Sequence, residues 1–345
     1  MTMLGASGSG KTTFVLGMYA NLVSGRHGYR VHAPNKQHIQ LMDSWDALWE
    51  NGTLPVANDE RAMVSYEFSF LRDLETLLVV DWLDYRGGAI RDDETKADAA
   101  ALIERLKVSH SVYLVLDGRV LGEWIRAHLQ AHVAGGPPPN LYGQRRNLRV
   151  EDMTNLLQTA FNARAEAGHP PPSIVVVITK QDTLPEITGL APQIALAFVA
   201  DRLAELVPVT IAHGVKTMVN PVQLGVLGAQ PTDRVQVESL HPIGFEYPFI
   251  FTFTEYLAAR IDETNLFLET ISRQQANNVQ EIAVMRSRFG GLFNQGRIGR
   301  LNSEQQHIVA EQQRLRNDLL RMQHQAKRLT ADLNSCVILR SGQRR

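Results

Sequence analysis

A glycine-rich segment near the N-terminus constrains the fold of this chain more than any other sequence feature. Residues 5–12 read Gly-Ala-Ser-Gly-Ser-Gly-Lys-Thr, which fits the G-x-x-x-x-G-K-[ST] pattern of phosphate-binding loops. The pattern requires a strand before it and a helix after it, and Met1–Leu4 and Thr12–Leu22 have the matching apolar patterns. Only four residues precede Gly5, so we expect either a short first strand or a natural start upstream of Met1.

The first two thirds of the chain alternate short aliphatic runs with helical patterns, which predicts βαβ units. We therefore expect an α/β fold of the P-loop NTPase type, with a mostly parallel sheet flanked by helices. The predicted strands are Met1–Leu4, Val64–Leu71, Leu77–Leu83, Ser111–Leu116, Ser173–Ile178 and Val215–Val219, and the predicted helices are Thr12–Leu22, Thr95–Val108, Asp152–Ala167 and Ile194–Leu206. Pro/Gly stretches mark residues 119–172 as an insertion over the sheet edge or top.

The pattern changes after Pro248, where apolar residues recur in alternating steps of four and three. Two such stretches flank a glycine-rich connection, which predicts an antiparallel helical hairpin. We divide the chain into a domain at 1–248 and a helical, coiled-coil-like module with a basic tail at 249–345. The heptads are equally compatible with packing within the chain and with pairing to a protein partner or a second copy.

Charge is balanced overall but not along the chain. There are 35 Lys and Arg against 36 Asp and Glu, whereas residues 286–345 hold 12 basic against four acidic side chains, a net of +8. The basic tail is compatible with nucleic acid or an acidic partner, although a solvated helix face is the commoner explanation.

Composition excludes several classes of protein. With 44% hydrophobic and 21% charged residues, the chain is typical of a folded globular protein. No apolar run approaches the ~18 residues of a membrane span. Cys336 is the single cysteine, which excludes an internal disulfide or a cysteine-rich zinc site and favours a cytoplasmic location.

The glycine-rich loop predicts a phosphate site by its chemistry. Backbone N–H groups of the loop and of the following helix can surround phosphate oxygens, Lys11 can reach the terminal phosphates, and the Thr12 hydroxyl can ligate Mg²⁺. The predicted binding residues are Gly5, Ser7, Gly8, Ser9, Gly10, Lys11, Thr12 and Thr13.

A second candidate lies at the end of the strand Leu77–Leu83. Asp84 begins the sequence Asp-Tyr-Arg-Gly, and a carboxylate at the carboxyl end of a strand can hold Mg²⁺ through water, while the N–H of Gly87 can bond a γ-phosphate. Asp81 competes for the metal, but it faces the opposite side of the strand. Asp84 is our predicted metal residue, together with Thr12.

A third candidate, Thr179-Lys180-Gln181-Asp182, follows the apolar strand Ser173–Ile178. The Asp182 carboxylate can accept from both N1–H and the exocyclic amine of guanine, and adenine offers no such donor pair. Because it follows the first two motifs in order, this stretch predicts selection of a guanine base.

The three stretches together resemble the motifs of Ras-like P-loop GTPases related to translation factors, over roughly residues 1–247. The resemblance implies that Lys11 contacts the β- and γ-phosphates, that Gly87 senses the γ-phosphate and that Lys180 and Asp182 hold guanine. A weaker similarity connects the chain to the bacterial double-GTPase proteins of conflict and defence systems. The family's further backbone-rich loop near the base is expected at Val222-Gln223-Leu224-Gly225.

The chain departs from the family pattern at two points. Gly88 replaces the glutamine that orients the attacking water, and Thr53 is an insecure match for the threonine that closes over Mg²⁺. Arg86 is a candidate internal arginine finger, although an arginine in a solvent loop is the more ordinary assignment.

We therefore expect an enzyme that binds GTP and GDP with Mg²⁺, hydrolyses GTP slowly and couples the nucleotide state to the helical module. One alternative is a nucleotide-bound scaffold that does not hydrolyse GTP. Another is a dynamin-like GTPase that remodels membranes.

Overall fold

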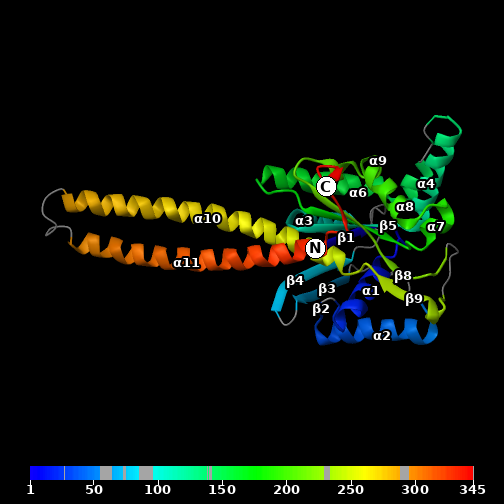
Figure 1. Ribbon diagram of the computed structural model, residues 1–345, viewed down its shortest axis with the longest axis horizontal. Coiled ribbons are helices and arrows are strands. Elements are labelled where there is room, and N and C mark those ends of the chain that lie inside the picture. Colours follow the sequence, from blue (N-terminus) through cyan, green and yellow to red (C-terminus); the bar gives the residue numbers. More distant parts are fainter. Residues whose placement is uncertain are drawn as a thin grey trace. The chain divides into compact units, whose positions relative to one another are not determined.

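The computed structural model describes residues 1–26, 28–54, 64–72, 75–84, 96–137, 139, 142–228, 234–287 and 295–344 (Figure 1). The chain forms two compact units. The sheet unit comprises Met1–Thr252 and Ser335–Arg345, and the hairpin unit comprises Phe253–Asn334.

The sheet unit is built on one large, mostly parallel sheet. Its strands are β1 (Thr2–Gly5), β2 (Tyr29–His32), β3 (Val64–Arg72), β4 (Glu75–Asp84), β5 (Ser111–Asp117), β6 (Ser173–Thr179), β7 (Lys216–Pro221), β10 (Val337–Arg340) and β11 (Gln343–Arg344). They lie in the order β11-β10-β7-β6-β5-β1-β4-β3-β2. The central strands β4, β1, β5, β6 and β7 are parallel, and the outer pairings are antiparallel. The predicted α/β class is confirmed, as are the six predicted strands to within three residues at each end.

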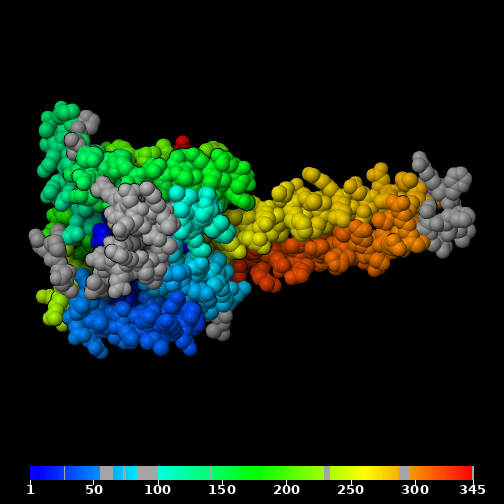
Figure 2. Space-filling view, turned by 180° about the vertical axis from the view of Figure 1, so that it is seen from behind, coloured from blue at the N-terminus to red at the C-terminus, as the bar shows by residue number. Residues whose placement is uncertain are grey.

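Helices cover both faces of this sheet. The helices of the described residues are α1 (Lys11–Val23), α2 (Asn35–Asn51), α3 (Lys96–Val108), α4 (Gly118–Val133), α5 (Tyr142–Leu148), α6 (Val150–Glu166), α7 (Thr183–Thr188), α8 (Pro192–Asp201) and α9 (Leu203–Leu206), followed by α10 (Tyr247–Ser287) and α11 (Gln295–Asp332). Of these, α11 and most of α10 belong to the hairpin unit. A small separate sheet pairs β8 (Gln223–Gly225) with β9 (Leu240–Ile243). In the space-filling view, α2 lies along one side of the sheet unit and the helices that follow β5 lie along the other (Figure 2).

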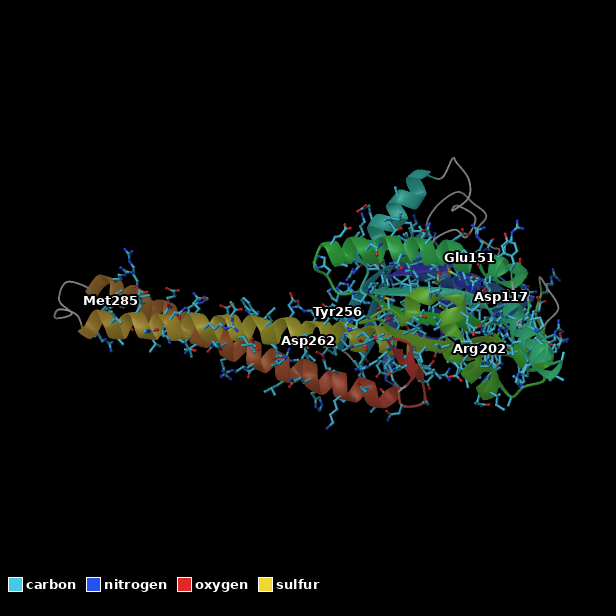
Figure 3. The ribbon with its side chains drawn as sticks, turned by 90° about the horizontal axis from the view of Figure 1, so that it is seen from above. Asp117, Glu151, Arg202, Tyr256, Asp262 and Met285 are labelled. Carbon is cyan, nitrogen blue, oxygen red and sulfur yellow. The ribbon has the colours of Figure 1, made fainter. Side chains whose placement is uncertain are left out.

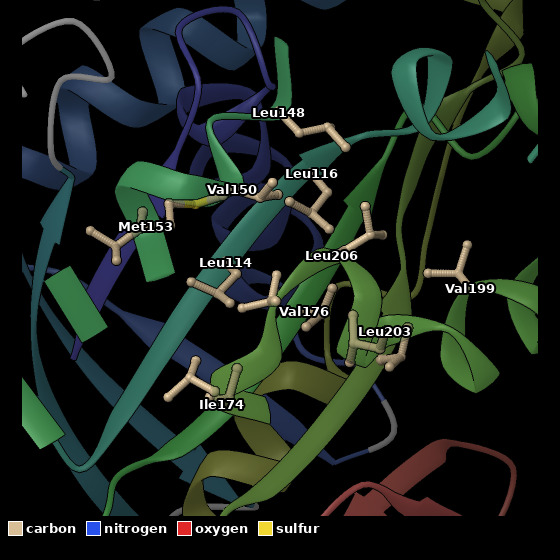
Figure 4. Packing of buried hydrophobic residues seen from close by; sticks show 14 of the residues in the cluster. Leu114, Leu116, Leu148, Val150, Met153, Ile174, Val176, Val199, Leu203 and Leu206 are labelled. Atoms are coloured by element: carbon tan, nitrogen blue, oxygen red, sulfur yellow. The ribbon is translucent and has the colours of Figure 1, made fainter. Parts of the chain in front are cut away.

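Alternate residues of the central strands supply two different cores. Leu114 of β5 and Val176 of β6 belong to an aliphatic cluster with Met153 of α6 and Leu206 of α9 (Figure 4). The neighbour of Leu114, Tyr113, faces the other way, toward Phe14 of α1. Because both faces are covered, every residue of β5 and β6 is buried, as expected for interior parallel strands.

Residues 119–172 were predicted to be an insertion over the sheet edge or top, but they contribute to the core of the sheet unit. They form most of the connection from β5 to β6, and α4 and α6 contribute Trp124, Ile125 and Met153 to the aliphatic cluster. The Pro/Gly stretches that indicated loops lie between or after these helices. The helices therefore form part of the core.

Apart from the first residues of α10, the two predicted long helices, α10 and α11, make up the hairpin unit. Figure 3 labels Tyr256, Asp262 and Met285 along α10. Contacts of Glu281 with Arg297 (2.5 Å) and of Gln274 with Glu304 (3.1 Å) establish antiparallel packing. The seam between the two helices follows the predicted spacing of four and three, and its most buried described residues are Leu257, Thr264, Ile271, Asn278, Ile282, Ile308, Gln312, Leu329 and Leu333. No helix in the described ranges combines the length and the apolar character needed to cross a membrane.

The end of the chain differs from the predicted helical module and basic tail. The helix α11 ends at Asp332, and β10 then pairs antiparallel with β7 in the sheet unit. Ser341 and Gly342, both with positive φ (47° and 79°), form the two-residue turn into β11. Val337 and Leu339 are buried, and this apolar alternation explains why the segment forms a strand of the sheet instead of a tail.

Candidate functional site

The candidate site lies at the carboxyl ends of the parallel strands. Strand β1 has β4 on one side and β5 on the other, so the chain direction across the sheet reverses at β1. Open α/β sheets bind ligands at such a switch point. The glycine-rich loop, Asp84, Asp117 and Thr179 all occupy the carboxyl ends of neighbouring strands.

The glycine-rich loop connects β1 to α1 through two left-handed residues. Gly8 and Gly10 have φ values of 72° and 89°, which side-chain-bearing residues adopt at a cost. Gly10 is also the residue before α1, and it has no side chain with which to cap the helix. The N-terminus of α1 therefore receives no cap from residue 10, which suits it to an anion.

Lys11 is buried inside this loop. Its ammonium donates to the carbonyl oxygens of Gly5 (3.0 Å) and Ala6 (2.8 Å), and only 9% of the residue is exposed. These contacts hold the positive charge beneath the loop, at the start of α1. Thr12 and Thr13 follow in the first helical turn and are partly exposed.

The predicted loop residues differ in their accessibility. Ser7 and Gly8 are exposed, whereas Ser9 is 1% exposed and its hydroxyl has no hydrogen-bond partner in the described protein. Ser9 instead contributes its carbonyl oxygen, which accepts from the Thr179 hydroxyl at 2.6 Å. The Ser9 side chain is therefore part of the interior, and its backbone N–H donates to the Ala6 carbonyl at 3.2 Å.

Asp84 ends strand β4 beside β1, with Met3 as its register partner. Its backbone is thus two residues from the point where β1 enters the glycine-rich loop. Tyr85, Arg86, Gly87 and Gly88 lie outside the described residues, as does the Asp84 side chain. The predicted catalytic and metal roles of these residues stay predictions.

Asp81, the competing carboxylate, is engaged elsewhere. It accepts from the Ser65 hydroxyl at 2.8 Å and forms an ion pair with Arg105. Partial burial raises the pKa of Asp81, but the hydrogen bonds from Ser65 and Arg105 outweigh it, so the pKa lies below its usual value. Its side chain is 56% exposed and belongs to a surface network.

Thr179 and Lys180 are tied directly to the glycine-rich loop. The Lys180 ammonium donates to the Gly8 carbonyl at 2.9 Å, beside the contact of Thr179 with Ser9. Two of the sequence motifs, about 170 residues apart, are therefore joined by hydrogen bonds. Lys180 has a left-handed backbone (φ 51°), and its carbonyl accepts from the Thr183 hydroxyl at 2.7 Å.

Asp182 faces a loop that the sequence placed elsewhere. One of its carboxylate oxygens, Oδ2, accepts from the backbone N–H groups of Leu227 (2.8 Å) and Gly228 (3.0 Å). The stretch Val222–Gly225 was expected to supply this backbone-rich loop, but its last three residues form β8 and pair with β9. The donors lie two residues further along, and backbone donors leave no side-chain signature in a sequence.

Asp117 is a site residue that the sequence analysis missed. It ends β5, is 7% exposed and forms an ion pair with Lys180 at 2.5 Å. Burial raises the pKa of the Asp117 carboxyl, but Lys180 and Arg119 outweigh burial and hold the pKa below its usual value. Its position at the end of an apolar run, like that of Asp84 and Thr179, was the available sequence signal.

The site therefore combines features suited to a nucleotide. Lys11 and the start of α1 supply positive charge for phosphates. Asp182, which follows β6, offers acceptor oxygens at the same edge of the sheet. Lys180, from the same loop, reaches the Gly8 carbonyl of the glycine-rich loop. Within the described residues no three His, Cys, Asp or Glu side chains gather as a metal-binding group. A Mg²⁺ ion commonly relies on one or two protein oxygens together with substrate phosphates, and the Thr12 hydroxyl with Asp84 is a donor set of that chemical type.

Three comparisons with known proteins gave no match: none to a family model, none to a curated protein and none to a solved structure.

Proposed function

We propose that this protein is a GTPase of the P-loop type, which binds GTP and GDP with Mg²⁺, hydrolyses GTP slowly and couples the nucleotide state to the hairpin unit. The observation that carries this proposal is the pair of hydrogen bonds from Thr179 and Lys180 to the backbone of the glycine-rich loop. A phosphate-binding segment and a base-binding segment are thereby held in one fixed relation. A single ligand that carries both groups fits this arrangement.

The proposed roles follow from position. The N–H groups of the glycine-rich loop and of α1 bind the phosphates, with Lys11 supplying charge. Asp182 accepts from the N1–H and amine of guanine. Thr12 and Asp84 hold Mg²⁺, which when bound neutralises developing charge on the phosphates. Gly88 has no side chain to orient water, so we expect slow hydrolysis.

The start of α10 supports the coupling to the hairpin. Its first two turns belong to the sheet unit, and Phe249 there lies 5.3 Å from Trp82 of β4 and 5.5 Å from Phe70 of β3, measured between ring centroids. Trp82 precedes Asp84 by two residues on the same strand. A displacement of the end of β4 would thus act directly on the first turns of α10.

Two further contacts join α10 to the same region. The Tyr113 hydroxyl of β5 donates to the carbonyl of Pro248 at 3.0 Å and contacts the Thr252 hydroxyl at 2.9 Å. Glu246, 2% exposed, pairs with Arg26 at 3.5 Å, just beyond the end of α1. Both α1 and β5 therefore connect the candidate site to the beginning of the long helix.

The base assignment is tested by titrating nucleotide-free protein with fluorescent GDP and ADP analogues in the presence of Mg²⁺. We expect the GDP analogue to bind at least about tenfold more tightly, because only guanine supplies two donors to Asp182. Equal affinity for the two analogues would contradict the guanine assignment.

Hydrolysis is tested separately by single-turnover measurements at saturating protein. We expect GTP to be converted slowly to GDP, and Lys11→Ala to abolish the conversion. Tight binding of GTP without conversion favours the alternative of a non-hydrolysing nucleotide-bound scaffold, which the missing side chain at Gly88 also favours. Lys107→Ala, which alters an exposed pair with Glu104, is the matched control.

A further inference from the structure

Asp117 makes three contacts, and they fall into two groups. Its Oδ1 accepts from the backbone N–H of Arg119 at 2.9 Å, which caps the N-terminus of α4. Its Oδ2 lies 2.5 Å from the Lys180 ammonium and 3.3 Å from the Arg119 guanidinium. The first contact is a capping bond that a neutral side chain can also make. The second group depends on negative charge.

Capping alone does not require an aspartate. Asn, Ser and Thr cap helices about as well, and they keep no charge in a buried position. A carboxylate that is 7% exposed is tolerated only when it is paired, and here two cations face it. The negative charge of Asp117 is therefore needed for its ion pairs and not for the cap. Lys180 is the closer of its two cationic partners.

Lys180 needs a partner because of where it is held. Its backbone is left-handed (φ 51°), a conformation that residues with side chains adopt at a cost. Its ammonium lies at the glycine-rich loop, which also holds the Lys11 ammonium and leads into the positive end of α1. The Gly8 carbonyl is a neutral acceptor and leaves the positive charge of Lys180 unbalanced. The Asp117 carboxylate supplies the missing negative charge.

We propose that Asp117 is a positioning residue whose charge holds Lys180 against the Gly8 carbonyl, and that this contact sets the lifetime and the base selectivity of the bound nucleotide. The proposal rests on the proposed function. It assigns Asp117 no contact with the nucleotide itself. Loss of its charge would release Lys180 from the glycine-rich loop and loosen the relation between the phosphate-binding and base-binding segments.

The variant Asp117→Asn separates the two roles. It retains an oxygen that can accept from the Arg119 N–H, so the cap of α4 is kept, but it removes the charge. We expect the fluorescent GDP analogue to dissociate about tenfold faster, and the preference for GDP over ADP to fall, from a variant that stays folded at pH 7 although it is less stable than wild type. Asp152→Asn is the matched control. It removes the charge of another carboxylate near the start of a helix, one that forms an ion pair with Arg149.

A double-mutant cycle with Lys180→Met identifies the route of the effect. If Asp117 acts through Lys180, Asp117→Asn has no further effect on dissociation in the Lys180→Met background. Additive effects, or an Asp117→Asn protein with wild-type dissociation and selectivity, would overturn the proposal. If Asp117→Asn does not fold at pH 7, Asp117→Ser is measured in its place, because serine also caps helices.

The same measurements separate this proposal from the function on which it rests. A wild-type protein that binds neither analogue would overturn both. A wild-type protein that binds GDP selectively, combined with an unchanged Asp117→Asn variant, would overturn only the role of Asp117.

Discussion

Phe14 of α1 stacks on Phe245, with ring centroids 5.7 Å apart and planes inclined by 22°. Phe245 lies two residues before α10 and also fills the space beside Gly17, one turn further along α1. The helix that leaves the glycine-rich loop is therefore packed directly against the segment that leads into the long hairpin.

The first prediction follows from that packing. A Cβ atom at residue 17 would lie 2.8 Å from the Phe245 ring, closer than real contacts allow. Gly→Ala inside a helix normally stabilises it by about 0.5–1 kcal/mol, but here we expect Gly17→Ala to destabilise the protein by about 1–3 kcal/mol. Urea unfolding measures the difference.

The matched control for Gly17→Ala is Gly143→Ala in α5, where a Cβ would meet nothing within 4 Å. We expect this variant to be as stable as the wild type or slightly more stable. If both variants gained stability, the close packing of Phe245 on α1 would be contradicted.

Asp182→Asn tests the base-binding role by altering one carboxylate. A neutral amide cannot accept from both donors of guanine, so we expect affinity for the GDP analogue to fall by about 10- to 100-fold. Affinity for the ADP analogue should stay unchanged. Asp201→Asn, at the end of α8, is the control, and an equal loss there would point to a general effect of charge.

Acidification should reveal the depressed pKa of Asp117. A carboxyl whose folded pKa lies below its unfolded value contributes stability above the unfolded pKa, and the contribution is lost as the pH falls through the folded pKa. We therefore expect wild type to exceed Asp117→Asn in stability at pH 7, and the gap to shrink below about pH 4. Unfolding in urea at both pH values measures this, and a gap independent of pH would contradict the assignment.

The buried polar side chain of Gln312 in the hairpin seam should lower the stability of the hairpin relative to an apolar one. Gln312 is 6% exposed, and its amide donates to the Ser272 hydroxyl at a long 3.3 Å. We expect Gln312→Leu to raise the free energy of unfolding of the hairpin by about 1 kcal/mol. Gln306→Leu, on the exposed face, should change it by less than about 0.5 kcal/mol. A loss of stability at residue 312 would show that the polar contact itself is stabilising.

Removal of the hairpin separates its role from that of the final strands. Replacing residues 253–334 with a flexible Gly/Ser linker keeps β10 and β11, and we expect it to preserve binding of the GDP analogue. Truncation after Thr252 also removes the buried Val337 and Leu339, so we expect it to lose about 3–6 kcal/mol of stability. Thermal unfolding and nucleotide titration of both proteins check this, and loss of binding on linker replacement would show that the hairpin belongs to the nucleotide site.

The sequence predicted the interior of the sheet well and its edges poorly. Strands β5 and β6 are continuous apolar runs because both of their faces are covered, and such runs are easy to recognise. The strand β2 has only four residues, of which Tyr29 and Val31 are buried, too short for a periodic signal. The strand β10 follows the heptads of α11 directly, so the helical pattern obscured it.

The candidate site was predictable where side chains carry the signal. Lys11, Thr179 and Asp182 were found from motifs, and each lies at the carboxyl edge of the sheet. Asp117 was missed because its importance depends on Lys180, 63 residues later, and on the pairing of β5 with β6. The donors of Leu227 and Gly228 were missed because a backbone N–H is present in almost every residue.

Because the chain returns to the sheet as β10, the hairpin is an insertion that is connected to the sheet unit at both of its ends. The polypeptide leaves the sheet unit through α10 and re-enters it beside β7. A nick between α10 and α11 would yield two fragments that still share the hairpin seam, and the smaller would keep its strand pairing with the larger. The chain is thus suited to fragment complementation, in which two separately made polypeptides reassemble into one protein.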